Sequence, residues 1–135
     1  MHRTAALAAA VLVAAIAAVP AAATPAPDPT ELPTAPRGLF LTVSGDENTW
    51  IRGVLLRCSP LPGGAHPEPV AACAELAVAR GDLDTLPGDP HPCTKEYDPV
   101  TVSATGSWRG RPTAWHKTYS NTCELSVATG AVFRF

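Results

Sequence analysis

The sequence has 135 residues, ten Lys and Arg, twelve Asp and Glu, and a formal net charge of −2. That length suits one domain with a single modest core. The charge pattern argues against nucleic acid as a partner, because no block of lysines and arginines is present to displace counterions from phosphates.

The beginning of the chain has the pattern of a signal peptide over residues 1–23. A short basic start precedes an apolar run over residues 5–19, which is too short to span a bilayer. Alanines at residues 21–23 provide the small side chains that signal peptidase requires before a cut at Thr24. An uncleaved anchor is the alternative, but Pro20 ends the run short of the roughly 20 apolar residues that a span needs. We therefore expect a secreted, extracellular protein that has no membrane association after cleavage.

All four cysteines lie after this cleavage site, at Cys58, Cys73, Cys93 and Cys123. An even number of cysteines in a small exported domain predicts a disulfide framework. Four cysteines allow three pairings, and all three stay open on these grounds. Structural zinc favours close Cys-x-x-Cys pairs, and the sequence has none.

Prolines recur through residues 24–36, which excludes a helix or a central strand and predicts a flexible N-terminal arm. The domain itself is therefore expected over residues 37–135. Its first elements are short apolar runs at residues 38–43 and 51–57, separated by polar residues, which predict the two strands of a hairpin.

The segment between Cys58 and Cys73 is rich in proline and glycine, which predicts a rigid loop. Residues 70–80 follow with helix-favouring alanine, glutamate and leucine, and Gly81 is a stop signal. We expect a helix there.

Apolar and polar residues alternate over residues 100–108, the period of a strand with one buried face. A turn at Arg109-Gly110 should reverse the chain into a strand over residues 113–119, and residues 131–135 are expected to form the last strand. Strands that outnumber helices and adjoin through short links predict an α+β domain, an antiparallel sheet with a helix on one face.

The sequence offers no arrangement typical of an enzyme. Neither a Gly-x-Ser-x-Gly elbow nor a His-Glu-x-x-His pair nor a phosphate-binding glycine loop is present. His66, His91 and His116 are scattered and predict structural or exposed side chains rather than a shared metal site. We expect no catalysis, no metal and no cofactor.

A different kind of site is indicated at residues 90–99, which are polar in the middle, contain Pro90, Pro92 and Pro99, and are fixed through Cys93. A protease binds its substrate as an extended strand, and ordering a free peptide costs about 0.5 to 1.5 kcal/mol for each immobilised side chain. A preformed loop avoids much of this cost. If an enzyme cuts after Lys95, the new amine stays beside the acyl-enzyme and religation competes with hydrolysis.

These residues resemble the Streptomyces subtilisin inhibitors over nearly the whole predicted mature chain. The similar stretches are Cys58-Ser59-Pro60, Gly64-Ala65-His66-Pro67-Glu68-Pro69, Ala72-Cys73-Ala74-Glu75-Leu76, Gly81-Asp82-Leu83, Cys93-Thr94-Lys95-Glu96-Tyr97-Asp98-Pro99-Val100, Gly106-Ser107-Trp108-Arg109-Gly110, Ser120-Asn121-Thr122-Cys123 and Val132-Phe133-Arg134-Phe135. The resemblance implies sequential disulfides, Cys58 with Cys73 and Cys93 with Cys123. It also implies a five-stranded antiparallel sheet, two short helices packed on one face, and a homodimer.

The same resemblance implies a reactive bond between Lys95 and Glu96, within a protease-binding loop formed by Cys93, Thr94, Lys95, Glu96, Tyr97 and Asp98. A lysine there suits the carboxylate-based pocket of trypsin-like enzymes, and its aliphatic stem also suits the roomier pocket of subtilisins. Asn121 is expected to support the loop through its amide, although an asparagine that caps a short helix has the same sequence pattern.

Two residues depart from the family pattern. Thr94 stands where proline is common, which gives up a fixed φ but adds a hydroxyl for bonding within the loop. Glu96 adds a charge next to Lys95 that could pair with Lys95 or with arginines. Two other functions remain open, a non-inhibitory secreted binding partner, such as a transglutaminase-associated protein, and an enzyme whose cleft the sequence does not show.

Overall fold

The computed structural model describes residues 20–26 and 37–135. Residues 20–26 are exposed and have no regular secondary structure, and they belong to a separate unit from the domain that follows. The rest of the predicted signal peptide (residues 1–23) and proline-rich arm (residues 24–36) lies outside the described residues. Within the described ranges, no helix has the length and apolar character needed to cross a membrane.

The domain is built on one five-stranded antiparallel sheet, as the family resemblance implied. The strand order is β3-β2-β1-β4-β5. The bounds are β1 Gly38–Gly45, β2 Ile51–Arg57, β3 Gly63–Gly64, β4 Val100–Trp108 and β5 Arg111–Tyr119. A short 3-10 turn, η1 (Asp46–Asn48), connects β1 to β2.

Both predicted hairpins are confirmed. Strand β1 pairs with β2, with Leu41 opposite Val54, and β4 pairs with β5, with Ala104 opposite Trp115. The predicted turn at Arg109-Gly110 has φ angles of 48° and 80°. Positive φ at both central residues is the type I′ geometry that matches the twist of paired strands.

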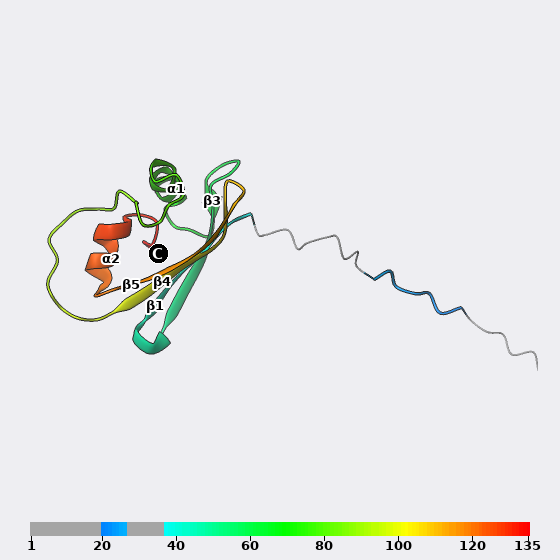
Figure 1. Ribbon diagram of the computed structural model, residues 1–135, viewed down its shortest axis with the longest axis horizontal. Coiled ribbons are helices and arrows are strands. Elements are labelled where there is room, and N and C mark those ends of the chain that lie inside the picture. Colours follow the sequence, from blue (N-terminus) through cyan, green and yellow to red (C-terminus); the bar gives the residue numbers. More distant parts are fainter. Residues whose placement is uncertain (1–19, 27–36) are drawn as a thin grey trace, which may run out of the picture. The chain divides into compact units, whose positions relative to one another are not determined.

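Two helices, α1 (Pro69–Val78) and α2 (Thr122–Thr129), lie with the C-terminal segment on one side of the sheet (Figure 1). The predicted helix over residues 70–80 is thus confirmed, although it ends two residues early, and Gly81 closes it at φ 80° by donating to Leu76 O. The core between helices and sheet contains Leu39, Leu41, Val43, Leu56, Ala72, Leu76, Val100, Val102, Ala104, Leu125, Val132 and Phe133. The buried residues of β4 are those that the alternation indicated.

The strand predicted over residues 131–135 is wrong. Ala131, Val132 and Phe133 are buried consecutively, whereas a strand with one covered face buries every second residue. Their backbone makes turns, with Val132 N donating to Thr129 O, and Ala131 N donates to the carboxylate of Glu75 in α1. The fifth strand is instead β3, which lies in the loop predicted between Cys58 and Cys73.

The opposite face of the sheet carries no helix (Figure 1). Thr42 and Ser103 share a hydrogen bond on this face, at 2.6 Å between their hydroxyl oxygens. Phe40 is 47% exposed and Ile51 is 63% exposed. This open face therefore combines small polar residues with exposed apolar ones.

Candidate functional site

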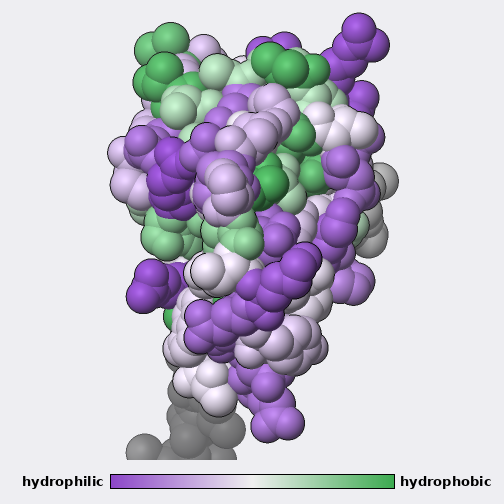
Figure 2. All heavy atoms as spheres, turned by 90° about the vertical axis from the view of Figure 1, so that its left-hand side faces the viewer, coloured by the Kyte–Doolittle hydropathy of each residue, from purple (hydrophilic) through white to green (hydrophobic). Residues whose placement is uncertain are grey.

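Residues 90–99 connect the α1 side of the domain to β4 and have no regular secondary structure. In Figure 1 they belong to a wide arc that passes outside α2 before it enters β4. Every residue from His91 to Asp98 is exposed except Cys93, which is partly buried. Figure 2 views this side of the molecule, which is mostly hydrophilic, with hydrophobic residues in separate patches.

This segment contains the reactive bond that the resemblance implies, and it is called the reactive loop below for that reason. It is attached at four points to residues 120–127. Asp89 N donates to Val127 O at 3.1 Å where the loop begins, and Asp98 N donates to Ser120 O at 2.9 Å where it ends. The Cys93–Cys123 disulfide and the side chain of Asn121 provide the two attachments between them. An exposed backbone is thereby held in one conformation without belonging to a helix or sheet.

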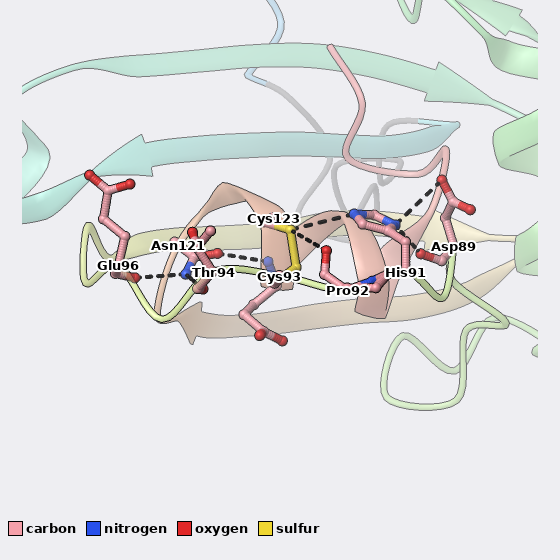
Figure 3. The surroundings of a disulfide bond; sticks show 9 residues. Asp89, His91, Pro92, Cys93, Thr94, Glu96, Asn121 and Cys123 are labelled. Atoms are coloured by element: carbon pink, nitrogen blue, oxygen red, sulfur yellow. Dashed lines mark hydrogen bonds and ion pairs between the residues drawn. A yellow bond between two sulfur atoms is a disulfide. The ribbon is translucent and has the colours of Figure 1, made fainter.

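The side chain of Asn121 contacts the backbone on both sides of Lys95. Its Nδ2 donates to Thr94 O at 3.4 Å and to Glu96 O at 2.7 Å. Figure 3 shows the amide of Asn121 between Thr94 and Glu96, with the Glu96 side chain directed away from it. One side chain thus fixes the carbonyl before Lys95 and the carbonyl after the Lys95-Glu96 bond.

The position of Asn121 follows from its role at the start of α2. Its Oδ1 accepts a hydrogen bond from Glu124 N at 2.8 Å, the contact expected of a helix N-cap. The residue is only 7% exposed. The two sequence interpretations of Asn121 are therefore compatible, since the oxygen caps the helix and the nitrogen contacts the loop.

The disulfides follow the sequential pairing that the resemblance implied. Cys93 pairs with Cys123 and ties the loop to the first turn of α2, and Cys58 pairs with Cys73 and ties β2 to α1. No free cysteine is present in the described ranges.

The residues at the centre of the loop are left available to solvent. Lys95 and Glu96 are exposed, and Tyr97 is 79% exposed. Among the described residues, Lys95 and Glu96 form no ion pair, and the hydroxyl of Thr94 makes no hydrogen bond. Glu96 was considered as an ion-pair partner of Lys95 or of arginines, and the Thr94 hydroxyl as the donor of a hydrogen bond within the loop. Neither interaction is present in the described part of the chain.

Sequence reasoning missed the contacts at the N-terminal side of the loop. His91 Nδ1 donates to Asp89 O at 2.6 Å, and its Nε2 lies 3.4 Å from Cys123 Sγ (Figure 3). Asp89 also accepts a hydrogen bond from Arg134 Nη2 at 3.2 Å. The proline on each side of His91 suggested rigidity, but no sequence signal indicated a C-terminal arginine as partner.

The three histidines are not brought together. His66 is buried, with Nε2 3.1 Å from Val132 O and Nδ1 accepting from Glu68 N, and His116 lies exposed in β5. Among the described residues, the one cluster with metal-like spacing is His91, Cys93 and Cys123. Its two sulfurs are bonded to each other, so they are not thiolate ligands.

Tyr119 lies at the end of β5, just before the residues that hold the loop. Burial raises the pKa of its phenol above 10.0, the nearby Lys117 opposes this shift, and Asp84 adds to it. The neutral phenol is therefore the form that the fold favours.

Comparison with known proteins places these features in a family context. The family model described as subtilisin inhibitor-like matches residues 35–121, a range that includes the reactive loop and Asn121. Subtilisin inhibitor-like protein 5 of Streptomyces fradiae is 44% identical over 106 residues, covering 75% of this chain and 99% of that protein. The subtilisin inhibitor of Streptomyces violaceus is 44% identical over 102 residues, covering 71% of this chain and 70% of that protein.

A solved structure is similar as well. It is the crystal structure of Streptomyces caespitosus sermetstatin in complex with Bacillus licheniformis subtilisin. The match has a TM-score of 0.59 and 36% sequence identity, and it covers 73% of this chain and 97% of that one.

Proposed function

The chain belongs to the subtilisin inhibitor-like family, and from this premise we propose that it inhibits subtilisin-type serine proteases by offering the Lys95-Glu96 bond as a substrate. The observation that carries the proposal is the bracketing of Lys95 by Asn121, whose amide holds the carbonyls of Thr94 and Glu96. The chain is also similar to sermetstatin, which was solved in complex with subtilisin, and this similarity supports subtilisin-type proteases as the targets.

The proposed mechanism depends on order that exists before the protease binds. The enzyme meets a loop already fixed at both ends, so little conformational entropy is lost on association. After attack on the carbonyl of Lys95, the amine of Glu96 stays in place, because Asn121 holds the Glu96 carbonyl and Asp98 is bonded to Ser120. Religation then competes with hydrolysis, and the complex dissociates slowly.

The side chain of Lys95 sets the proposed specificity. Its ammonium group would pair with the carboxylate at the base of a trypsin-like pocket, and its aliphatic stem would fill the wider pocket of a subtilisin. We therefore include trypsin-like enzymes among the targets. Glu96 should weaken binding to any protease whose active-site rim is acidic, because like charges across an interface repel.

We extend the proposal to location and assembly. The signal-peptide pattern over residues 1–23 supports secretion, which brings the inhibitor into contact with extracellular proteases. The open sheet face, with Phe40 and Ile51 exposed, supports a homodimer formed by two such faces. Sedimentation equilibrium should give a dimer mass for the wild type and a monomer mass for Phe40→Lys, whereas a monomeric wild type refutes the assembly.

The experiment that tests the function is a titration of trypsin, subtilisin and chymotrypsin with purified protein. We expect stoichiometric inhibition of subtilisin and trypsin. Lys95→Asp should weaken trypsin inhibition at least about 30-fold, because truncating an interface hot spot costs at least about 2 kcal/mol. Lys117→Asp is the matched control, since Lys117 is the other lysine of the sequence and lies in β5 outside the loop.

The outcomes separate the alternatives. Inhibition that survives Lys95→Asp unchanged contradicts the role of Lys95, and tight inhibition of none of the three enzymes contradicts the inhibitor function. The second result would favour a non-inhibitory binding or regulatory protein.

A further inference from the structure

Asp89 directly precedes the reactive loop, and its backbone and side chain have partners in three parts of the fold. Its N–H donates to Val127 O of α2 at 3.1 Å. Its carbonyl oxygen accepts from His91 Nδ1 at 2.6 Å (Figure 3), and its carboxylate accepts from Arg134 Nη2 at 3.2 Å. The entry to the loop is therefore fixed by α2, by the loop itself and by the C-terminal segment.

The backbone immediately before Asp89 allows the close approach to α2. Gly88 has a φ of 66°, in the left-handed region that favours glycine. A Cβ at Gly88 would collide with Val127 O, the oxygen that accepts from Asp89 N. A larger residue would therefore push the chain away from α2, and glycine lets Asp89 reach it.

Arg134 reaches Asp89 from a backbone that is itself held in place. The residue before it, Phe133, is buried. The residue after it, Phe135, lies edge-on to the buried ring of His66, with 5.6 Å between the ring centres. Because the neighbours on both sides are packed, the Arg134 side chain starts from a fixed point and loses less conformational freedom when it pairs.

The guanidinium of Arg134 pairs with two carboxylates. Its Nη2 lies 3.2 Å from Asp89 Oδ2, and its Nη1 lies 3.7 Å from Glu68 Oε2, at the start of α1. An isolated exposed ion pair contributes little, whereas a network of charges can contribute more. This network links α1, the C-terminal segment and the entry to the loop.

His91 extends these contacts toward the reactive bond. Its Nδ1 donates to Asp89 O, and its Nε2 lies 3.4 Å from Cys123 Sγ (Figure 3). The ring thus lies between the loop entry and the disulfide that Cys123 forms with Cys93. Lys95 is two residues beyond Cys93. The segment that leads to Lys95 is therefore held by the disulfide and by the contacts of Asp89.

We propose that Asp89 and Arg134 position the Lys95 side of the reactive bond, as Asn121 positions the Glu96 side. This role rests on the proposed function, in which a protease serine forms an ester with the Lys95 carbonyl and releases the Glu96 amine. That amine attacks the ester and restores the peptide bond, or water hydrolyses the ester. A loose segment before Lys95 lets the ester move away from the amine, so Asp89 and Arg134 prolong inhibition.

The test compares Arg134→Ala and Asp89→Asn with a matched control, Asp84→Asn. The Lys117–Asp84 pair is 3.3 Å long against 3.2 Å for Arg134–Asp89, and both aspartate side chains are 57% exposed, but Asp84 lies outside the loop. With a catalytic amount of subtilisin, Arg134→Ala and Asp89→Asn should be cut about threefold faster than the wild type, within the range that an exposed ion pair contributes. Asp84→Asn should be cut at the wild-type rate.

A double variant distinguishes a pair that acts together from two separate losses of structure. Asp89→Asn/Arg134→Ala should be cut about threefold faster than the wild type, not about ninefold, because each single change already removes the shared interaction. Arg134→Lys keeps the cation and should recover most of the wild-type resistance. About ninefold faster cutting of the double variant would overturn the proposed pairing.

Relaxation of the ¹⁵N-labelled Lys95 amide tests the positioning without a protease. Its order parameter should fall in Arg134→Ala and keep the wild-type value in Asp84→Asn. An unchanged order parameter in Arg134→Ala, or equal cutting of Arg134→Ala and Asp84→Asn, overturns the proposal. A wild type that inhibits no protease contradicts the proposed function instead, and the order parameter then decides the positioning alone.

Discussion

Asn121 has two structural roles, because the oxygen and the nitrogen of its side-chain amide contact two different parts of the fold. The oxygen caps α2 and the nitrogen holds the loop. The cap has a local sequence signal, an asparagine followed three residues later by Glu124. The loop contact joins residues 25 positions apart, so only the family resemblance could indicate it.

The two functions of Asn121 can be separated by two substitutions. Asn121→Ala removes both, and the lost cap should cost about 1 kcal/mol and lower the melting temperature by roughly 4 to 8 °C. Asn121→Asp keeps an oxygen for Glu124 N but loses both donors to the loop. We expect the aspartate variant to stay folded, to inhibit subtilisin at least about tenfold more weakly and to be cut faster.

The comparison requires thermal unfolding and inhibition time courses for both variants. Wild-type inhibition by Asn121→Asp would contradict the bracing of the loop by the amide.

The raised pKa of Tyr119 predicts how the stability of the protein changes at alkaline pH. Because burial raises the pKa of its phenol above 10.0, the contribution of Tyr119 to stability is complete below pH 10 and is lost as the pH rises through the higher pKa of the folded state. Urea unfolding between pH 8 and 11.5 should show a steeper loss of stability above pH 10 in the wild type than in Tyr119→Phe. Parallel curves for the two proteins would show that this phenol does not contribute.

Among the helices and strands, the sequence predicted the ones in which apolar and polar side chains follow a regular period. Strand β4 was evident because Val100, Val102 and Ala104 face the core and their neighbours do not. Strand β3 consists of Gly63 and Gly64, which have no side chains to form a pattern.

The family resemblance implied a second short helix, but the local sequence pattern did not place helix α2, for a different reason. Its buried residues are only Leu125 and Thr129, too few for a helical pattern to stand out. The next apolar residues, from Ala131 to Phe133, suggested a strand instead. Their burial is set by Glu75 and Trp115, which approach from distant parts of the chain. The N-cap signal at Asn121 was the one local indication of the helix.

The two disulfides should contribute similar amounts to the stability of the protein but should differ in their effect on inhibition. They close separations of 30 residues for Cys93–Cys123 and 15 for Cys58–Cys73. In the chain-entropy model, these separations correspond to about 3.6 and 3 kcal/mol. Replacing both cysteines of either pair by alanine should therefore lower the free energy of unfolding by similar amounts.

Only the loss of Cys93–Cys123 should turn the inhibitor into a substrate, because only that bond ties the reactive loop to α2. Urea unfolding measures the first effect, and trypsin activity followed over hours measures the second. Permanent inhibition by the Cys93→Ala/Cys123→Ala protein, at a temperature where it is folded, would argue against the disulfide as a tether.

At the scale of the whole molecule, one short segment organises the site. Residues 120–127 provide the disulfide partner, the bracing amide and the backbone acceptors for both ends of the loop. The sheet positions this segment, because β5 leads into it and β4 begins where the loop ends. The reactive loop thus depends on contacts between distant parts of the chain, which local sequence patterns do not show.

The most direct test of the central claim is mass spectrometry of the inhibitor after incubation with a catalytic amount of subtilisin. We predict one cut, between Lys95 and Glu96, so the unreduced protein gains the mass of one water while Cys93–Cys123 keeps the two pieces together. Reduction should then release two fragments, one ending at Lys95 and the other beginning at Glu96. A first cut at any other bond, in a protein that inhibits the enzyme, would contradict the assignment of the reactive bond.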